Sequence, residues 1–98
     1  MNKIQIANVL AEQAKKMGPV YDHEQFGLLS VQLRAGEAVP AHAVNTTAIV
    51  IVRSGEVVFD VEGTEVQLTA EDVLQFEPNE MHSLVAVTDV DLVVVRFK

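Results

Sequence analysis

The sequence predicts an all-β fold in which roughly eight to ten short strands form two packed sheets. The chain is 49% hydrophobic with only one Tyr and four Phe, and β-branched aliphatic residues dominate its middle and its C-terminal part. Short apolar segments alternate with turn residues from residue 28 onward. Two such segments are separated only by Glu62 and Gly63, a spacing typical of a tight β-hairpin.

Length and charge limit what the chain can be. Its 98 residues suit one domain with a single modest core. The net charge is −7: residues 1–53 contain five Lys or Arg and four Asp or Glu, whereas residues 54–98 contain two and ten. Phosphate backbones are bound by basic surfaces, so nucleic acid is not expected as a partner. We interpret the acidic half as a solvated surface.

Membrane insertion and export are not expected either. No apolar run approaches the roughly 20 residues that a bilayer-spanning helix needs. The start of the chain lacks the basic stretch, apolar stretch and small-residue cleavage site of a signal peptide. The absence of cysteine excludes disulfides and thiol chemistry. We therefore expect a cytoplasmic protein that does not associate with membranes.

The first part of the chain, residues 1–27, is expected to be a helical segment that covers a barrel domain formed by residues 28–98. A three-to-four spacing of apolar residues predicts a short helix over 6–17. The residues that give this spacing are Ile6, Val9, Leu10, Ala14 and Met17. Asn8 can cap the start of the helix, and Gly18-Pro19 can end it. His23 follows in a polar stretch and is interpreted as a solvated loop histidine.

The remaining chain predicts strands at residues 28–34, 42–52, 56–61, 64–68, 73–76, 82–87 and 92–97. Side chains alternate between the two faces of a strand. One face of the strand that follows His42 would therefore present His42, Val44, Thr46, Ala48, Val50 and Val52. The opposite face would present Ile49 and Ile51, which need a cover if the first face looks inward.

Two segments resemble the motifs of the cupin family. In residues 36–55, Gly36 is followed by His42 beside Pro40, and then by a hydrophobic strand that ends at Gly55. The second segment is Pro78-Asn79-Glu80-Met81-His82-Ser83. The resemblance covers residues 28 to 97 and implies the cupin architecture, a double-stranded β-helix or jelly-roll barrel.

The resemblance also implies a metal site, but an incomplete one. In typical cupins the first motif supplies a His-x-His pair and a glutamate, and the second motif supplies one more histidine. His42 matches the first ligand and His82 the last, whereas Val44 and Ala48 occupy the other two positions and have no lone pair. Two ligands rarely hold a divalent ion, so no metal or only a weakly bound one is expected. The nearest further donors are Asn45, Glu80 and His23.

The motifs and the strand alternation predict a ligand pocket lined by His42, Val44, Thr46, Ala48, Val50, Gln75, His82 and Leu84. The rings of His42 and His82 are expected to face each other across the interior. Two neutral imidazoles in an apolar cavity could bind an anionic or hydroxylated small molecule directly, and either could carry a proton near neutral pH. The structural alternative is a pair of partly buried histidines that bond only to backbone or water. For Gln75 the alternative is an exposed position.

Two functions remain open. The first is a small stand-alone cupin that binds an unidentified small molecule in the barrel, as a binding or sensing module. The second is a metal-dependent cupin enzyme of the dioxygenase or isomerase type, which would use His42 and His82 with an irregular third ligand. The sensor half of a transcription factor is a third possibility, but this chain contains no helix-turn-helix pattern. The sequence identifies neither the ligand nor a reaction.

The distribution of apolar residues predicts a homodimer. Ile49 and Ile51 lie opposite the histidine face, and two segments are apolar on both sides of their strands, Val57-Val58-Phe59 and Val93-Val94-Val95. A strand that is apolar on both sides is normally buried on both sides. Because one short covering segment can bury only part of this surface, a second copy of the chain is expected to bury the rest. Cupins often pair in this way, so the resemblance implies the same.

Overall fold

The computed structural model describes residues 1–98 and contains nine strands and no helix. The strands are β1 (Lys15–Asp22), β2 (Phe26–Leu33), β3 (Ala38–His42), β4 (Ala48–Ser54), β5 (Val57–Val61), β6 (Thr64–Leu68), β7 (Val73–Phe76), β8 (His82–Ala86) and β9 (Val90–Phe97). The prediction of an all-β fold is therefore confirmed. The chain has no helix long and apolar enough to cross a membrane.

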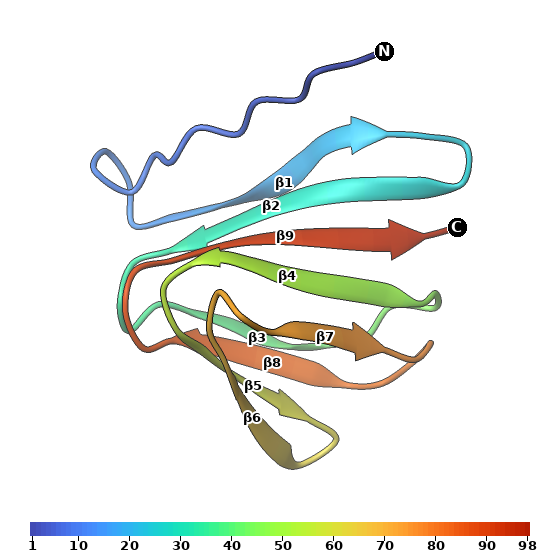
Figure 1. Cartoon of the computed structure of the whole chain (residues 1–98). Helices are drawn as coiled ribbons and strands as arrows, with labels where there is room; N and C mark the ends of the chain where they lie inside the picture. The colour runs from blue at the N-terminus through green and yellow to red at the C-terminus, as the bar shows by residue number, and fades with distance from the viewer.

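Two antiparallel sheets pack against each other (Figure 1). The five-stranded sheet has the order β1-β2-β9-β4-β7, and the four-stranded sheet has the order β3-β8-β5-β6. Their inner faces supply a core of 14 buried residues that includes Leu33, Val50, Val57, Phe59 and Leu92. No strand of one sheet pairs with a strand of the other, so the predicted barrel is not closed. The edge strands of both sheets remain unpaired on one side, which makes the fold an open two-sheet sandwich.

The predicted strand over 42–52 is interrupted. β3 ends at His42, β4 begins at Ala48, and the residues between them carry the chain from the four-stranded sheet to the five-stranded sheet. The predicted alternation holds from Ala48 onward, since Val50 and Val52 are buried in the core while Ile51 is 40% exposed on the opposite face. His42 and Val50 therefore belong to different sheets, although both face the interior.

The hairpin predicted at Glu62-Gly63 is confirmed. Val61 of β5 pairs with Thr64 of β6, which leaves a two-residue loop. Both loop residues have positive φ, 51° at Glu62 and 87° at Gly63, as the tight turns of this length require. The backbone N–H of Gly63 also donates to the Asp60 carboxylate at 3.0 Å.

Gly55, which ends the first motif, has a structural role. Its φ is 87°, and a Cβ placed on it would lie 2.0 Å from the carbonyl oxygen of Asp89. Any side chain at this position would therefore displace the backbone that leads into β9.

The predicted helix over 6–17 is wrong. The first fourteen residues run in a largely extended path across the outer face of the five-stranded sheet (Figure 1). Lys15 to Met17 begin β1 and pair with the end of β2, from Leu33 to Val31. Part of the segment that was expected to cover the barrel is thus an edge strand of the larger sheet.

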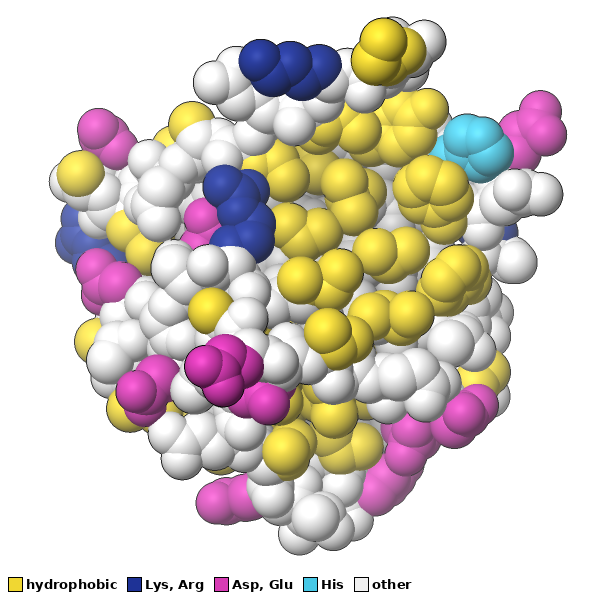
Figure 2. Space-filling model, viewed as in Figure 1, with side chains coloured by type: hydrophobic (Ala, Val, Ile, Leu, Met, Phe, Trp, Pro, Cys, Tyr) yellow, Lys and Arg dark blue, Asp and Glu magenta, His cyan; other side chains and the backbone are white.

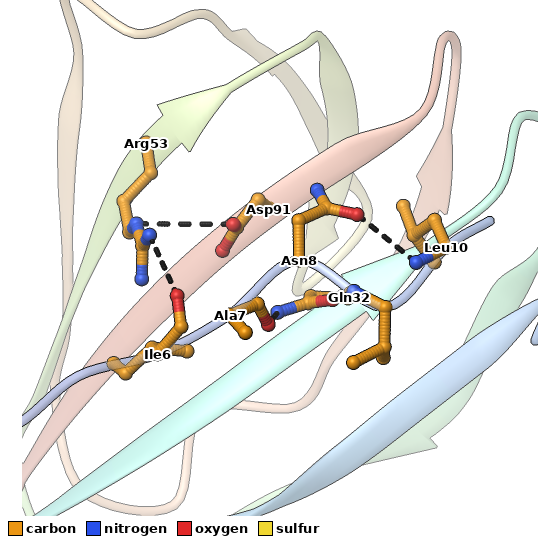
Figure 3. A network of polar contacts seen from close by, with 8 residues as sticks. Ile6, Ala7, Asn8, Leu10, Gln32, Arg53 and Asp91 are labelled. Carbon is orange, nitrogen blue, oxygen red and sulfur yellow. Dashed lines mark hydrogen bonds and ion pairs between the residues drawn. The ribbon is translucent and has the colours of Figure 1, made fainter. Parts of the chain in front are cut away.

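Side chains of the sheet form hydrogen bonds with the backbone of this N-terminal segment (Figure 3). Gln32 accepts from the N–H of Val9 at 2.8 Å and donates to the carbonyl oxygen of Ala7 at 2.9 Å. Arg53 donates to the carbonyl oxygen of Ile6 at 3.0 Å. These bonds satisfy backbone groups that a helix would have paired internally, so the apolar spacing does not produce a helix.

The N-terminal segment leaves much of the outer face of the five-stranded sheet uncovered. Figure 2 shows apolar side chains gathered there, with a basic and an acidic side chain at their edge. The exposed members include Ile51 at 40%, Val73 at 64% and Phe97 at 40%. Ile51 pairs with both Val73 and Val93, which makes the apolar surface continuous across three strands.

Candidate functional site

A cavity lies between the two sheets and is lined by 15 residues, 12 of them hydrophobic. The space that a water-sized sphere can occupy inside it is about 60 Å³. The three polar lining residues are His42, His82 and Arg96. An apolar cavity with a few polar side chains has the composition of a small-molecule site.

His42 and His82 come together because β3 pairs with β8. The two residues are register partners at the ends of these strands, and their ring centroids lie 4.4 Å apart with the ring planes at 60°. The rings therefore meet side by side on one sheet and do not face each other from opposite walls. His82 is 7% exposed and stacks on Phe76 of the other sheet, with centroids 4.1 Å apart and planes at 15°.

Each imidazole has one nitrogen fixed by the backbone. His42 Nδ1 lies 3.0 Å from the carbonyl oxygen of Pro40, and His82 Nδ1 lies 3.0 Å from that of Glu80. A carbonyl oxygen only accepts, so Nδ1 must carry the hydrogen in both rings. In the neutral ring Nε2 then has a free lone pair, and neither Nε2 forms a hydrogen bond within the chain. Two acceptors are thus left for a group from outside.

Burial lowers the pKa of His82 below the ordinary value of 6.5, and this is the largest of the influences on it. The hydrogen bond to the Glu80 carbonyl raises that pKa, the nearby charges of His42 and Arg96 lower it, and the Glu80 carboxylate raises it. The net result is a lowered pKa, so His82 is predominantly neutral at pH 7.

The donor atoms present do not fit a tight divalent metal site. Nowhere does the fold bring together three or more His, Cys, Asp or Glu side chains in an arrangement that could hold a metal. Val44 and Ala48, at the motif positions of the missing ligands, line the cavity and offer no lone pair. Such sites usually use at least three protein ligands. The two imidazole Nε2 atoms could contribute to a weak site.

The three further donors considered from sequence do not join the histidines. The Glu80 carboxylate accepts from the backbone N–H of Glu77 at 2.6 Å. Asn45 is exposed and lines a separate groove. His23 lies in the turn after β1 and stacks on Phe26, with ring centroids 4.9 Å apart.

The cavity contains six of the eight residues predicted for the pocket: His42, Val44, Ala48, Val50, His82 and Leu84. Thr46 lies outside it because the strand is interrupted between His42 and Ala48, so the alternation does not extend through this position. Gln75 also lies outside. It is exposed opposite Ile49 on β7, and its amide donates to the Phe76 carbonyl and to Glu77, as the alternative of an exposed glutamine anticipated.

The sequence analysis missed Arg96. This residue lines the cavity from β9, where its cross-strand partners are Gly27 and Ala48. Its Nε is buried and has no hydrogen-bond partner, and neither ion pair of the chain involves it. The alternation Leu92, Val94, Arg96 could have shown that it faces inward, because these residues share the inner face of β9.

A second groove, which we call the end groove, adjoins the cavity at Arg96. Asp22, Asn45, Thr46 and Lys98 line it together with Arg96. The Asp22 carboxylate accepts a hydrogen bond from Lys98, and the Thr46 hydroxyl is buried without a partner. Arg96 therefore lies between the apolar cavity and a polar groove.

Comparison with known proteins agrees with this architecture. A solved RmlC-like cupin from Desulfovibrio desulfuricans is 24% identical, with a TM-score of 0.87 over 99% of this chain and 96% of that one. An RmlC-like cupin family protein with a double-stranded β-helix fold from Methanocaldococcus jannaschii is 15% identical, with a TM-score of 0.85 over 99% and 90%. A conserved protein of unknown function from Streptococcus pyogenes is 14% identical, with a TM-score of 0.81 over 100% and 90%. No curated protein matches.

These identities are low, so the solved structures show the fold alone. The family follows from the sequence itself, because the sequence model of the cupin domain matches residues 29–97, well over half of the chain. The two motifs and the two-sheet architecture agree with that match. The chain belongs to the cupin domain family.

Proposed function

We propose that this cupin binds a small organic molecule in the cavity between its sheets, as a binding or sensing module, with metal absent or weakly bound. One observation carries the proposal: the three polar residues of an otherwise apolar cavity all have unused hydrogen-bonding capacity. His42 and His82 each have a free Nε2, and Arg96 has an unpartnered Nε. The Arg96 Nε is also buried, and a buried polar group without a partner is costly.

The structural alternative explains only part of this arrangement. Hydrogen bonds to the carbonyl groups of Pro40 and Glu80 account for the Nδ1 atoms of both histidines. They do not account for two Nε2 acceptors and a guanidinium beside the same apolar cavity. A bound molecule with complementary polar groups would satisfy all three.

A metal-dependent enzyme of the dioxygenase or isomerase type is the second candidate. It is favoured by the Nδ1 hydrogen bonds, since metal-binding histidines commonly donate their other ring nitrogen to a carbonyl oxygen. It requires a third ligand from outside the cavity or from a rearranged loop.

Two measurements test the proposal. Metal analysis of protein purified without a nickel column should find little bound metal. A thermal-shift screen of small metabolites should identify molecules that raise the unfolding midpoint, because a ligand of the native state stabilises it. Ala48→Leu fills the cavity and should abolish that shift, whereas Ala70→Leu, at an exposed turn, should keep it.

Two results would overturn the proposal. The first is a metal at full occupancy, bonded at about 2.0–2.2 Å by both imidazoles and a carboxylate, which would favour the enzyme. The second is a ligand shift that Ala48→Leu leaves unchanged, which would place binding outside the cavity.

We also propose that the chain forms a homodimer through the uncovered outer face of the five-stranded sheet. Ile51, Val73 and Phe97 are exposed there, and a continuous exposed apolar surface of this kind is typical of an interface. The apolar segments that suggested a partner differ in structure: Val57 and Phe59 are core residues, whereas Val93 and Val95 lie on the outer face beside Ile51 and Ile49.

Light scattering at micromolar concentration tests the dimer. Wild type should have twice the 10.7 kDa chain mass, and Ile51→Glu should have the chain mass. Val85→Glu is the matched control, because Val85 is also 40% exposed but lies on the four-stranded sheet, and it should leave the dimer intact. A wild-type mass near 10.7 kDa would rule out the proposed dimer.

A further inference from the structure

Arg96 is a cation without an ion-pair partner, and it lies where the cavity meets the end groove. Its cross-strand partners, Gly27 and Ala48, have no polar side chain. The only carboxylate that lines the adjoining end groove belongs to Asp22, which is engaged by Lys98. Arg96 as a whole is half-buried, but its Nε is buried without a partner. An unpaired buried donor is costly, so the guanidinium is open to an anion from outside.

The charge and shape of the guanidinium limit what that anion can be. The cavity is lined by one cation and no carboxylate, and His82 is neutral at pH 7, which suits a single negative charge. A guanidinium presents a planar fork of N–H donors that matches a carboxylate. A phosphate monoester would bring up to two charges and more acceptors than one guanidinium can satisfy.

The two imidazoles require a hydrogen-bond donor on the bound molecule, whereas Arg96 requires an acceptor. With Nδ1 protonated, each neutral ring offers only an acceptor at Nε2, and an acceptor repels a carboxylate oxygen. The bound molecule must therefore present a donor beside its carboxylate. An ammonium group would be repelled by Arg96, whose charge already lowers the pKa of His82, so a neutral hydroxyl fits better.

The hydrophobic lining and the small size of the cavity limit the rest of the bound molecule. The other 12 lining residues are hydrophobic, which suits a short alkyl chain. The space open to the centre of a water-sized sphere is only about 60 Å³, so the cavity is small. Among the carboxylates this limits the occupant to a short chain.

We infer that the cavity binds a short-chain hydroxycarboxylate, with its carboxylate on Arg96 and its hydroxyl donating to an imidazole Nε2 of His42 or His82. The inference rests on the proposed function and names the class of its ligand. It needs no metal and no covalent step.

Calorimetric titration with four probes tests it at pH 7.5. Lactate has both groups, propionate lacks the hydroxyl, lactamide lacks the charge, and propionamide lacks both. Lactate should bind most tightly, with affinity at least tenfold above that of lactamide, since a charged hydrogen-bonded pair is roughly twice as strong as a neutral one. Loss of the hydroxyl should cost about fivefold.

Substitutions in the protein test which side chain binds the carboxylate of lactate and which binds its hydroxyl. Arg96→Gln should reduce lactate affinity at least tenfold and lactamide affinity by a smaller factor, because lactamide loses only a neutral hydrogen bond. Arg96→Lys should lie between wild type and Arg96→Gln because it keeps the charge but loses the fork. Lys16→Gln removes an exposed cation of β1 that lines neither the cavity nor the end groove, and it should leave lactate affinity unchanged. His82→Phe should reduce the preference for lactate over propionate.

Three results would overturn the inference: no lactate binding at 50 mM, equal affinity for lactate and lactamide, or an equal loss in Lys16→Gln and Arg96→Gln. The Ala48→Leu variant separates this failure from that of the proposed function. If neutral molecules bind and Ala48→Leu abolishes their binding, the cavity is a ligand site and only the carboxylate assignment falls. If Ala48→Leu leaves every binding signal unchanged, the proposed function falls with it.

Discussion

Strand β9 carries two charged residues on opposite faces, and their surroundings differ. Asp91 points outward beneath the N-terminal segment, and its side chain is only 4% exposed. Its carboxylate lies 3.8 Å from Arg53 Nε, and Arg53 also holds the Ile6 carbonyl (Figure 3). Arg96 points inward to the cavity and has neither an ion pair nor a partner for its Nε.

The two charges differ in whether the chain places an opposite charge beside them. Burial raises the pKa of Asp91, and the charge of Arg53 opposes that shift, so the chain supplies partial compensation. One carboxylate oxygen of Asp91, Oδ1, still has no hydrogen-bond partner. That pair also connects the sheet to the N-terminal segment, which is a structural role. At Arg96 the chain supplies no opposite charge, and we propose that a ligand in the cavity does so.

The largest expected effect on stability comes from breaking the ion pair between Arg53 and Asp91. Arg53→Ala should reduce the free energy of unfolding by about 2 kcal/mol at pH 7, because it leaves the buried Asp91 carboxylate unpaired and releases the Ile6 carbonyl. This figure allows for the partial exposure of Arg53. Urea denaturation measures the change. The double variant Arg53→Ala with Asp91→Asn should recover part of the loss, and an unchanged stability of Arg53→Ala would show that the pair is not structural.

Replacing Arg96 on the inner face should change the free energy of unfolding in the opposite direction. Arg96→Met replaces the guanidinium with an apolar chain, which suits the hydrophobic cavity. Without ligand it should increase the free energy of unfolding by about 1 kcal/mol, since the buried Nε that lacks a partner is removed. If Arg96→Met destabilises the fold as much as Arg53→Ala does, Arg96 is a structural residue and the contrast disappears.

A smaller effect is expected from pH. The folded state lowers the pKa of His82 below 6.5, so folding favours the neutral ring. The stability that this contributes is fully present above pH 6.5 and is lost as pH falls through the lower pKa of the folded state. Urea midpoints between pH 7.5 and pH 5 should therefore fall for wild type and fall less for His82→Asn. His23→Asn, in the turn after β1, is the control and should keep the wild-type slope; equal slopes in all three proteins would contradict the prediction.

The sequence by itself determined the features that depend on local pattern. Alternation and composition predicted the all-β class and the inward row Ala48, Val50 and Val52, and turn chemistry predicted the hairpin at Glu62-Gly63. These follow from periodicity and backbone preference, which neighbouring residues decide. The motif resemblance likewise predicted the family and selected His42 and His82.

Only the tertiary structure decided the features that depend on residues far apart in the chain. The N-terminal segment has helical spacing but is extended, because Gln32 and Arg53 from distant strands bind its backbone. The histidine rings adjoin because β3 pairs with β8 in one register. Arg96 became a candidate only when the fold showed that no carboxylate reaches it, since the absence of a partner depends on every element that packs around a side chain and not on the residues beside it in sequence.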